Sequence, residues 1–225
     1  MKARTELEVL QLLDEEFAWR RKELGTIHAD VSSAAINSRP VRLRAGTALL
    51  YAHWEGFVKA ASEAYIDFVA RRRLQYRQLC PGLLALALRS RLNTLMSSDE
   101  ASAHVAFVEF MLGDLASHAQ LPKRGVIKTG ANLNSQRLKV IVLTLGLDYA
   151  PFELKANLID HQLLDMRNNI AHGRSLFPSE GDFEVLYQEM STLLRNFKDQ
   201  IANAVILKAY LKGDQSSQPG SSPAS

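Results

Sequence analysis

Apolar residues at helical spacing run through the segment from about Leu43 to Arg73. A helix places residues three or four positions apart on one face, so this spacing forms a continuous stripe. The stripe consists of Leu50, Tyr51, Trp54, Phe57, Val58, Ala61, Tyr65, Phe68 and Val69. Other elements must cover so long an apolar face to remove it from water. The segment therefore predicts a core helix with further helices packed around it.

The same apolar spacing occurs along most of the remaining chain. The first and last predicted helices are long, at about 5–33 and from 179 or 182 to about 211. Shorter helices are expected at 83–95, from 98 onwards, at 135–145 and at about 154–172. Without a convincing strand, this pattern predicts an all-α fold. We expect a single-domain bundle of about six helices, of which the first, second and last are long.

Composition separates a helical domain from a tail. Of the 225 residues, 47% are apolar and 23% are charged, which is ordinary for a globular protein. Residues 1–212 contain all the predicted helices and are expected to form one domain. Residues 213–225 are rich in Ser, Gly and Pro and cannot bury an apolar core. They are expected to be a disordered tail.

The sequence lacks the patterns of several functional classes. No apolar run approaches the roughly 20 residues that span a bilayer, and no signal-peptide core is visible. The single cysteine, Cys80, fits a reducing compartment, so we expect a cytoplasmic protein without a membrane partner. One Cys and six scattered His form no metal cluster, and no glycine-rich phosphate loop occurs. No metal or cofactor is therefore expected, while the net charge of +3 permits a nucleic-acid partner.

The segment from Leu163 to Gly173 contains the most chemically informative residues. It reads Leu-Leu-Asp-Met-Arg-Asn-Asn-Ile-Ala-His-Gly. At about 100° per residue, a helix places apolar residues on one side: Leu163, Met166 and Ile170. It places polar residues on the other side: Asp165, Asn168, Asn169 and His172. Arg167 falls on the apolar side, where a permanent cation needs an acidic partner or a phosphate. Gly173 predicts the end of the helix.

An Arg and a His five residues apart suit phosphodiester cleavage without a metal. Histidine accepts and donates protons near neutral pH, so His172 could move a proton at a ribose 2′-OH or at a leaving oxygen. Arg167 could stabilise the charge of the transition state. The alternative is purely structural, because cations at a helix C-terminus also complement the helix dipole. Spacing alone leaves both interpretations open.

The run Arg-Asn-Asn-Ile-Ala-His-Gly at 167–173 resembles the Arg-x4-6-His motif of the HEPN superfamily, including the polar residue after the Arg. The segment 50–59 also resembles an early helix of one prokaryotic branch of that superfamily. Its fold is a helical bundle, and many members are metal-independent endoribonucleases of toxin–antitoxin, phage-defence and RNA-processing systems. The resemblance thus implies an RNA substrate and a partner protein such as an antitoxin or defence component.

The resemblance also implies roles for individual residues. His172 is expected to act as general base or acid, and Arg167 to bind the scissile phosphate. Asn168 is expected to hydrogen-bond the phosphate or to orient the imidazole. The implied reaction is attack by the 2′-OH, which leaves a 2′,3′-cyclic phosphate. The implied assembly is a homodimer in which two Arg–His pairs form one composite site.

Two acidic residues and a basic loop are expected to support this site. Glu55 lies at the edge of the apolar stripe and is a natural partner for Arg167, either near the substrate or as a structural ion pair. Asp165 is a second supporting candidate. The segment 117–133 lacks a helical pattern and carries Lys123, Arg124 and Lys128, which are candidate RNA contacts or part of an ordinary surface insertion.

The other function that the sequence permits is a non-enzymatic helical module. In that case Arg167 and Glu55 form a buried structural pair, and His172 caps its helix. The bundle then serves to dimerise or to bind a partner or a nucleotide. Elsewhere, the basic residues 20–22 and His53 are expected to face solvent.

Overall fold

The computed structural model describes residues 4–122, 125–127, 129–130 and 132–213. Their α-helices are α1 Glu6–Ser32, α2 Arg39–Arg71, α3 Pro81–Ser97, α4 Ala101–Gly113, α5 Ser135–Thr144, α6 Ala150–Glu153, α7 Asp165–Ala171 and α8 Glu180–Ile206. Three shorter helical segments are η1 Tyr76–Gln78, η2 Asp114–Ala116 and the π-helix η3 Leu158–Leu164. The described residues contain only isolated β-bridges, so the predicted all-α fold is confirmed.

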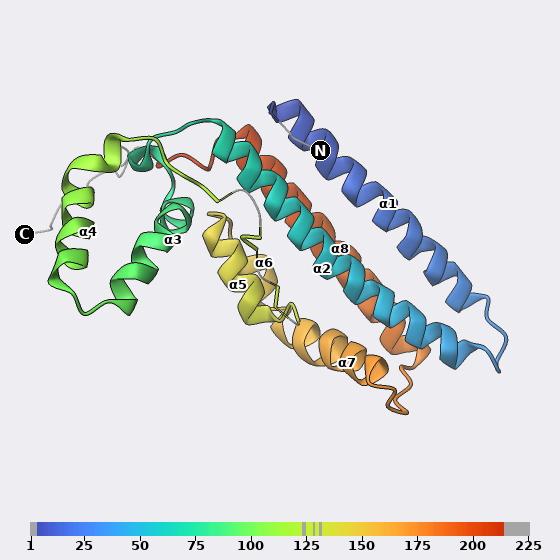
Figure 1. Ribbon diagram of the computed structural model, residues 1–225. Helices are drawn as coiled ribbons and strands as arrows, with labels where there is room; N and C mark the ends of the chain where they lie inside the picture. The colour runs from blue at the N-terminus through green and yellow to red at the C-terminus, as the bar shows by residue number, and fades with distance from the viewer. Residues whose placement is uncertain (1–3, 123–124, 128, 131, 214–225) are drawn as a thin grey trace, which may run out of the picture.

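Helices α1, α2 and α8 lie side by side and form the long axis of the molecule (Figure 1). Every residue of the predicted α2 stripe is at most 1% exposed, because α1 and α8 pack against it. Capping boxes at Thr5 and Ser179 fix where α1 and α8 begin. Among the helices of the described residues, none combines the length and apolarity that a membrane crossing requires.

The motif segment is less regular than the single helix expected at 154–172. α6 is a separate short turn, and the chain then continues through η3 into α7. A π-helix has a wider turn than an α-helix, so the angles of a regular helix apply only from Asp165 onwards. Phe152 in α6 anchors this segment through ring contacts with Trp54 of α2 and Phe197 of α8. Gly173 has a φ of +68° and ends the helix as predicted.

Helices α3 and α4 form an arm that extends away from the three long helices (Figure 1). The arm has a small core of its own, made by Tyr76, Leu88 and Phe110. Phe110 is the one α4 residue that is buried, although α4 is rich in apolar side chains. The arm therefore exposes much of an apolar helix to solvent.

The close approach of α3 to α5 depends on Gly82. A Cβ atom at this position would lie 2.2 Å from the backbone oxygen of Leu143. Because backbone atoms cannot turn aside, Gly82→Ala is expected to separate the two helices and destabilise the protein by about 1–3 kcal/mol. Urea unfolding measures this change. Gly113→Ala is the matched control, because nothing lies within 4 Å of a Cβ there; equal stability of both variants would contradict the packing argument.

Two residues expected to face solvent are buried between α1 and α2. Arg20 is 7% exposed, pairs with Glu16 and lies over the ring of Trp19 at 4.2 Å. His53 is 4% exposed, and its ring lies 2.7 Å from a carboxylate oxygen of Glu23. Burial lowers the pKa of His53. Apolar spacing did not predict the burial of Arg20 and His53, because acidic partners and aromatic rings on α1 offset the cost of burying their polar groups.

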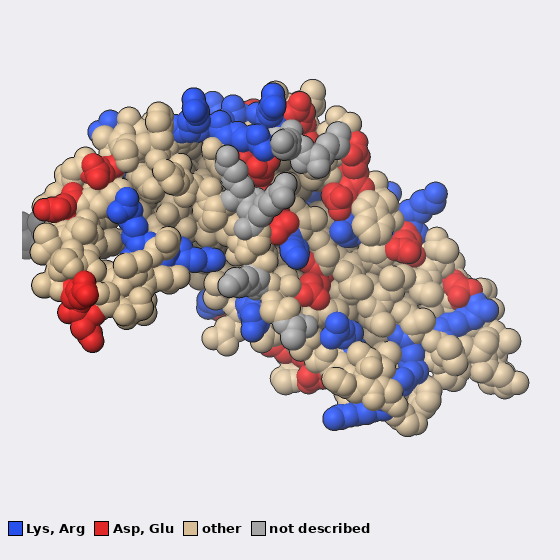
Figure 2. Space-filling view, viewed as in Figure 1, with Lys and Arg blue, Asp and Glu red and all other residues tan. Residues whose placement is uncertain are grey.

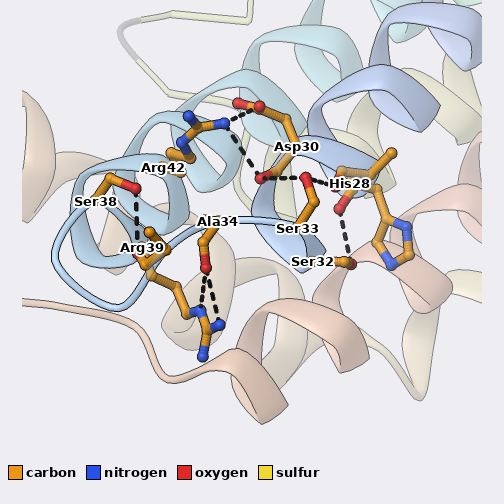
Figure 3. A network of polar contacts seen from close by, with 10 residues as sticks. His28, Asp30, Ser32, Ser33, Ala34, Ser38, Arg39 and Arg42 are labelled. Atoms are coloured by element: carbon orange, nitrogen blue, oxygen red, sulfur yellow. Dashed lines mark hydrogen bonds and ion pairs between the residues drawn. The ribbon is translucent and has the colours of Figure 1, made fainter.

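The turn between α1 and α2 is held by the polar network in Figure 3. Nη2 of Arg39 donates to the backbone oxygen of Ala34 at 2.9 Å, and Arg42 pairs with Asp30. Pro40 occupies the first turn of α2, where no backbone N–H is needed. The chain therefore reverses tightly between the two helices, and α2 starts a few residues earlier than expected.

Candidate functional site

Arg167 lies half-buried on the ring of Tyr51, which α2 contributes. Its guanidinium carbon is 4.7 Å from the centroid of that ring, a distance typical of a cation–π contact. Its Nη1 donates to the side-chain oxygens of Asn132 at 3.1 Å and Asn168 at 2.9 Å. Arg167 therefore turns toward α2, as its angle on the helix predicts, and its partners in the described residues are neutral.

Tyr51 positions the segment that precedes α5. Its hydroxyl accepts a hydrogen bond from the backbone N–H of Leu133 at 2.6 Å. Burial raises the pKa of Tyr51 to about 12, and the charge of Glu55 acts in the same direction. The phenol therefore stays neutral at ordinary pH. By holding Leu133, it also holds the neighbouring Asn132 where its side chain meets Arg167.

Among the described residues, no ion pair joins Glu55 to Arg167, and a role for Glu55 near the substrate stays a prediction. Tyr51 and Glu55 are four residues apart on α2, so they share one face of the helix. Arg167 meets the Tyr51 ring, while Glu55 lies near enough to Tyr51 to raise its pKa. Tyr51 therefore lies near both the acid and the cation.

The Asp165 side chain pairs with a neighbour in its own segment. Its carboxylate lies 3.0 Å from Nδ1 of His161, four residues earlier, and both side chains are exposed. It makes no hydrogen bond with Arg167 or His172. A supporting role for Asp165 has no contact in the structure that would carry it.

His172 closes α7 with its side chain exposed. Its backbone N–H donates to the oxygen of Asn168 at 3.0 Å. The imidazole and the Arg167 guanidinium do not hydrogen-bond to each other. The imidazole is therefore accessible to a substrate or to a second protomer.

Hydrogen bonds from two arginines hold the chain directly after His172. Nη1 of Arg44, on α2, donates to the backbone oxygens of Arg174 at 2.7 Å and Leu176 at 2.6 Å. Nη1 of Arg174 donates in turn to the side-chain oxygen of Asn169 at 3.0 Å. These bonds fix the end of α7 against α2, so the position of His172 is determined on both sides.

The surroundings of the motif are cationic. Arg44, Arg167 and Arg174 form no ion pair with any acidic side chain of the described residues. Cations without acidic partners attract phosphate groups, and guanidinium groups match phosphate oxygens in pairs. Together with an accessible imidazole, they can hold a phosphate and transfer a proton beside it. The described residues contain no cluster of His, Cys, Asp and Glu suited to a metal ion.

Sequence reasoning missed four participants in this site: Arg44, Tyr51, Asn132 and Arg174. Arg174 follows the motif directly, so its charge was visible as a further candidate. Tyr51 was expected only as a member of the apolar stripe. Arg44 and Asn132 come from distant segments, and helical spacing does not indicate which residues they contact. The proposed RNA contacts Lys123, Arg124 and Lys128 lie outside the described residues, as do residues 214–225 of the expected tail.

Removal of the Tyr51 hydroxyl tests how the site is held. In Tyr51→Phe, the buried N–H of Leu133 loses its acceptor, which should destabilise the protein by about 1–3 kcal/mol. Thermal or urea unfolding measures the loss. Tyr187→Phe is the control, because that ring packs on His28 and its hydroxyl makes no hydrogen bond with the described residues. An unchanged stability in Tyr51→Phe would show that the hydrogen bond contributes little.

Comparison with known families identifies the family of this chain. The family model described as HEPN_MAE_28990-like HEPN matches residues 9–210. The match includes the Arg167–His172 segment and extends from α1 to the end of α8. Comparisons with curated proteins and with solved structures gave no match. Since the family model covers most of the chain, and the fold is all-α as in that family, this protein belongs to the HEPN_MAE_28990-like HEPN family.

Proposed function

We propose that this protein is a metal-independent endoribonuclease. The observation that carries the proposal is the state of Arg167, a half-buried cation whose partners are two neutral amides and an aromatic ring. A half-buried charge without an acid is stabilised by an anionic ligand. The accessible imidazole of His172 stands at the end of the same helix. An RNA phosphodiester supplies the anion for Arg167, and the adjacent ribose 2′-OH supplies a proton that His172 can accept.

The reaction transfers two protons and exchanges one bond to phosphorus. A base takes the proton of the ribose 2′-OH, and the 2′-oxygen attacks the phosphorus. The bond to the 5′-oxygen of the next nucleotide breaks, and an acid donates a proton to that oxygen. The products carry a 2′,3′-cyclic phosphate and a 5′-OH. Arg167 stabilises the charge on the phosphate oxygens, and Asn168 orients Arg167 through its side-chain oxygen.

One protomer offers a single imidazole at the motif, whereas the reaction needs a base and an acid. We therefore propose a homodimer in which the motifs of two protomers face each other across a two-fold axis. One His172 then accepts the first proton, and the partner copy of the same residue donates the second. An exposed His172 at the end of a helix is consistent with such a meeting.

The first test is cleavage of total RNA in EDTA by the wild type and by His172→Ala. We expect that only the wild type cuts and that its products end in 2′,3′-cyclic phosphate. His161→Ala is the matched control, because His161 is exposed nearby and pairs with Asp165 rather than lying at the motif. Equal cleavage by wild type and His172→Ala would contradict the proposal.

A second candidate function is a non-catalytic module that binds a partner protein. It is favoured by the exposed apolar residues of α4: Val105, Val108, Met111 and Leu112. Contiguous apolar surface of this kind often marks an interaction site. An antitoxin or a defence-system protein is the partner class implied by the family. Folded wild-type protein that never cuts RNA, alone or with such a partner, would favour the module over the nuclease.

A further inference from the structure

A cavity of about 470 Å³ lies between α3 and α5, apart from the Arg167 site. It is within the range of volumes that small-molecule sites occupy. Its walls come from α3, from residues 126–127 and from α5, and they include Arg89 and Arg137. The lining contains two arginines and no acidic residue. Figure 2 shows Lys and Arg side chains extending from the α3–α4 arm toward the middle of the molecule.

The two arginines have no acidic partner in the described residues. The guanidinium of Arg137 packs against Gly130. A Cβ atom added to Gly130 would lie 2.4 Å from Nη1 of Arg137. Arg89 donates through Nη1 to the backbone oxygen of Val126 at 3.4 Å, which is a long hydrogen bond. Each guanidinium has five donors, so most of them are left for another acceptor. The contacts with Val126 and Gly130 therefore use few of the N–H donors of Arg89 and Arg137.

The remaining lining supplies the other parts of a nucleotide site. Val126, Ile127, Val140 and Ile141 form an apolar wall against which a base can pack. The Asn134 side-chain oxygen caps α5 and the Thr144 hydroxyl donates to Val140. The side-chain N–H groups of Asn134, the amide of Gln136 and the accepting lone pairs of Thr144 are left to hydrogen-bond a base edge or a ribose hydroxyl. A guanidinium can bind a phosphate or stack on a base. The combination of charge, apolar wall and mixed hydrogen-bonding groups fits a nucleotide better than a simple anion.

The cavity is close to the motif along the chain. Asn132 accepts a hydrogen bond from Arg167, and Asn134 lines the cavity. Two residues span at most about 7 Å. Leu133, between them, is fixed by Tyr51. A second cavity of about 430 Å³ shares Arg89 and Thr144 with the first and continues along α3 and α5. The two form one groove that leads away from the motif.

We propose that this groove binds a nucleotide unit, with its phosphate at Arg89 and Arg137 and its base on the apolar wall. The unit is either a nucleotide of an RNA strand that passes Arg167 or a free nucleotide. The strand assignment rests on the proposed nuclease function, whereas the nucleotide chemistry of the groove does not. The site explains why two arginines line a cavity without an acid.

The test is calorimetric binding of the four nucleoside 5′-monophosphates and of a short RNA that lacks the 2′-OH groups needed for cleavage. Wild type is compared with Arg137→Gln, Arg89→Gln and Arg91→Gln. Arg91 is the matched control, because it is exposed on the same helix, stacks on Phe110 and does not line the groove. All these side chains are on the surface, and circular dichroism checks that the variants fold. We expect binding to weaken about tenfold or more in Arg137→Gln and Arg89→Gln, and to stay unchanged in Arg91→Gln.

The two kinds of ligand, the monophosphates and the short RNA, identify the source of the nucleotide. If the RNA displaces the monophosphate and both lose affinity in Arg137→Gln, the groove holds a strand. If only the monophosphate loses affinity, the groove holds a free nucleotide. If no monophosphate and no RNA binds more weakly to Arg137→Gln and Arg89→Gln than to wild type, the proposal is overturned. Binding to the groove by a wild type that cuts no RNA, alone or with a partner protein, would contradict the nuclease function and leave this site intact.

Discussion

Mixing wild-type protein with His172→Ala is expected to lower RNA cleavage more than simple dilution of the wild type would. In the proposed composite site, both copies of His172 act on the same phosphodiester, one as base and the other as acid. A mixed dimer keeps only one of the two imidazoles and should lose about 10²–10⁴-fold in rate, which is the range for removal of a positioned proton donor. Equal mixing leaves about a quarter of the dimers with both imidazoles, so the rate should fall to about a quarter of the rate of wild type at the same total concentration.

The measurement is initial cleavage rate against the fraction of wild-type protein, at constant total concentration and after the subunits have exchanged. The rate should follow the square of that fraction. Mixtures of wild type with His161→Ala are the control and should keep the wild-type rate at every ratio. If the rate instead falls in direct proportion to the wild-type fraction, each protomer cuts with its own His172, and the composite arrangement is wrong.

The main helices could be predicted because their apolar spacing is determined by burial. The α2 stripe is continuous and every member is buried, so sequence and packing agree there. The end of the motif helix was equally predictable, since Gly173 adopts a positive φ that glycine favours. Apolar spacing failed to predict burial at residues that are both polar and buried. Arg20 and His53 are polar and buried because residues on another helix compensate for their charge or their polarity.

The candidate site was predictable only in its local part. Arg167, Asn168 and His172 lie within one turn and a half of helix, so a single segment determines their relation. The partners of Arg167 come from 35 residues away, at Asn132, and from α2, at Tyr51. Helical spacing contains no information about such pairings. Spacing also favoured Glu55 as the neighbour of Arg167, because it does not show which of two residues on one face lies under the guanidinium, and that residue is Tyr51.

The ring of Phe152 determines whether the motif segment stays attached to the bundle. Phe152 is fully buried, and its ring centroid lies 6.1 Å from Phe197 and 6.5 Å from Trp54. Phe152→Ala removes these contacts and leaves a cavity among rings that cannot collapse into it. We therefore expect a loss of about 3–5 kcal/mol in the free energy of unfolding. Urea unfolding followed by tryptophan fluorescence measures this loss, because Trp54 is one of the neighbouring rings.

Leu154→Ala is the matched control, since Leu154 is only two residues away and 90% exposed. Its stability should change by no more than about 0.5 kcal/mol. The comparison separates burial from position in the chain, because both changes fall in the same segment before η3. In Phe152→Ala, Arg167 and His172 keep their own contacts while their support on α2 and α8 weakens. Cleavage should therefore fall more steeply with temperature in Phe152→Ala than in Leu154→Ala. Equal stability of the two variants would mean that the aromatic cluster does not hold the motif in place.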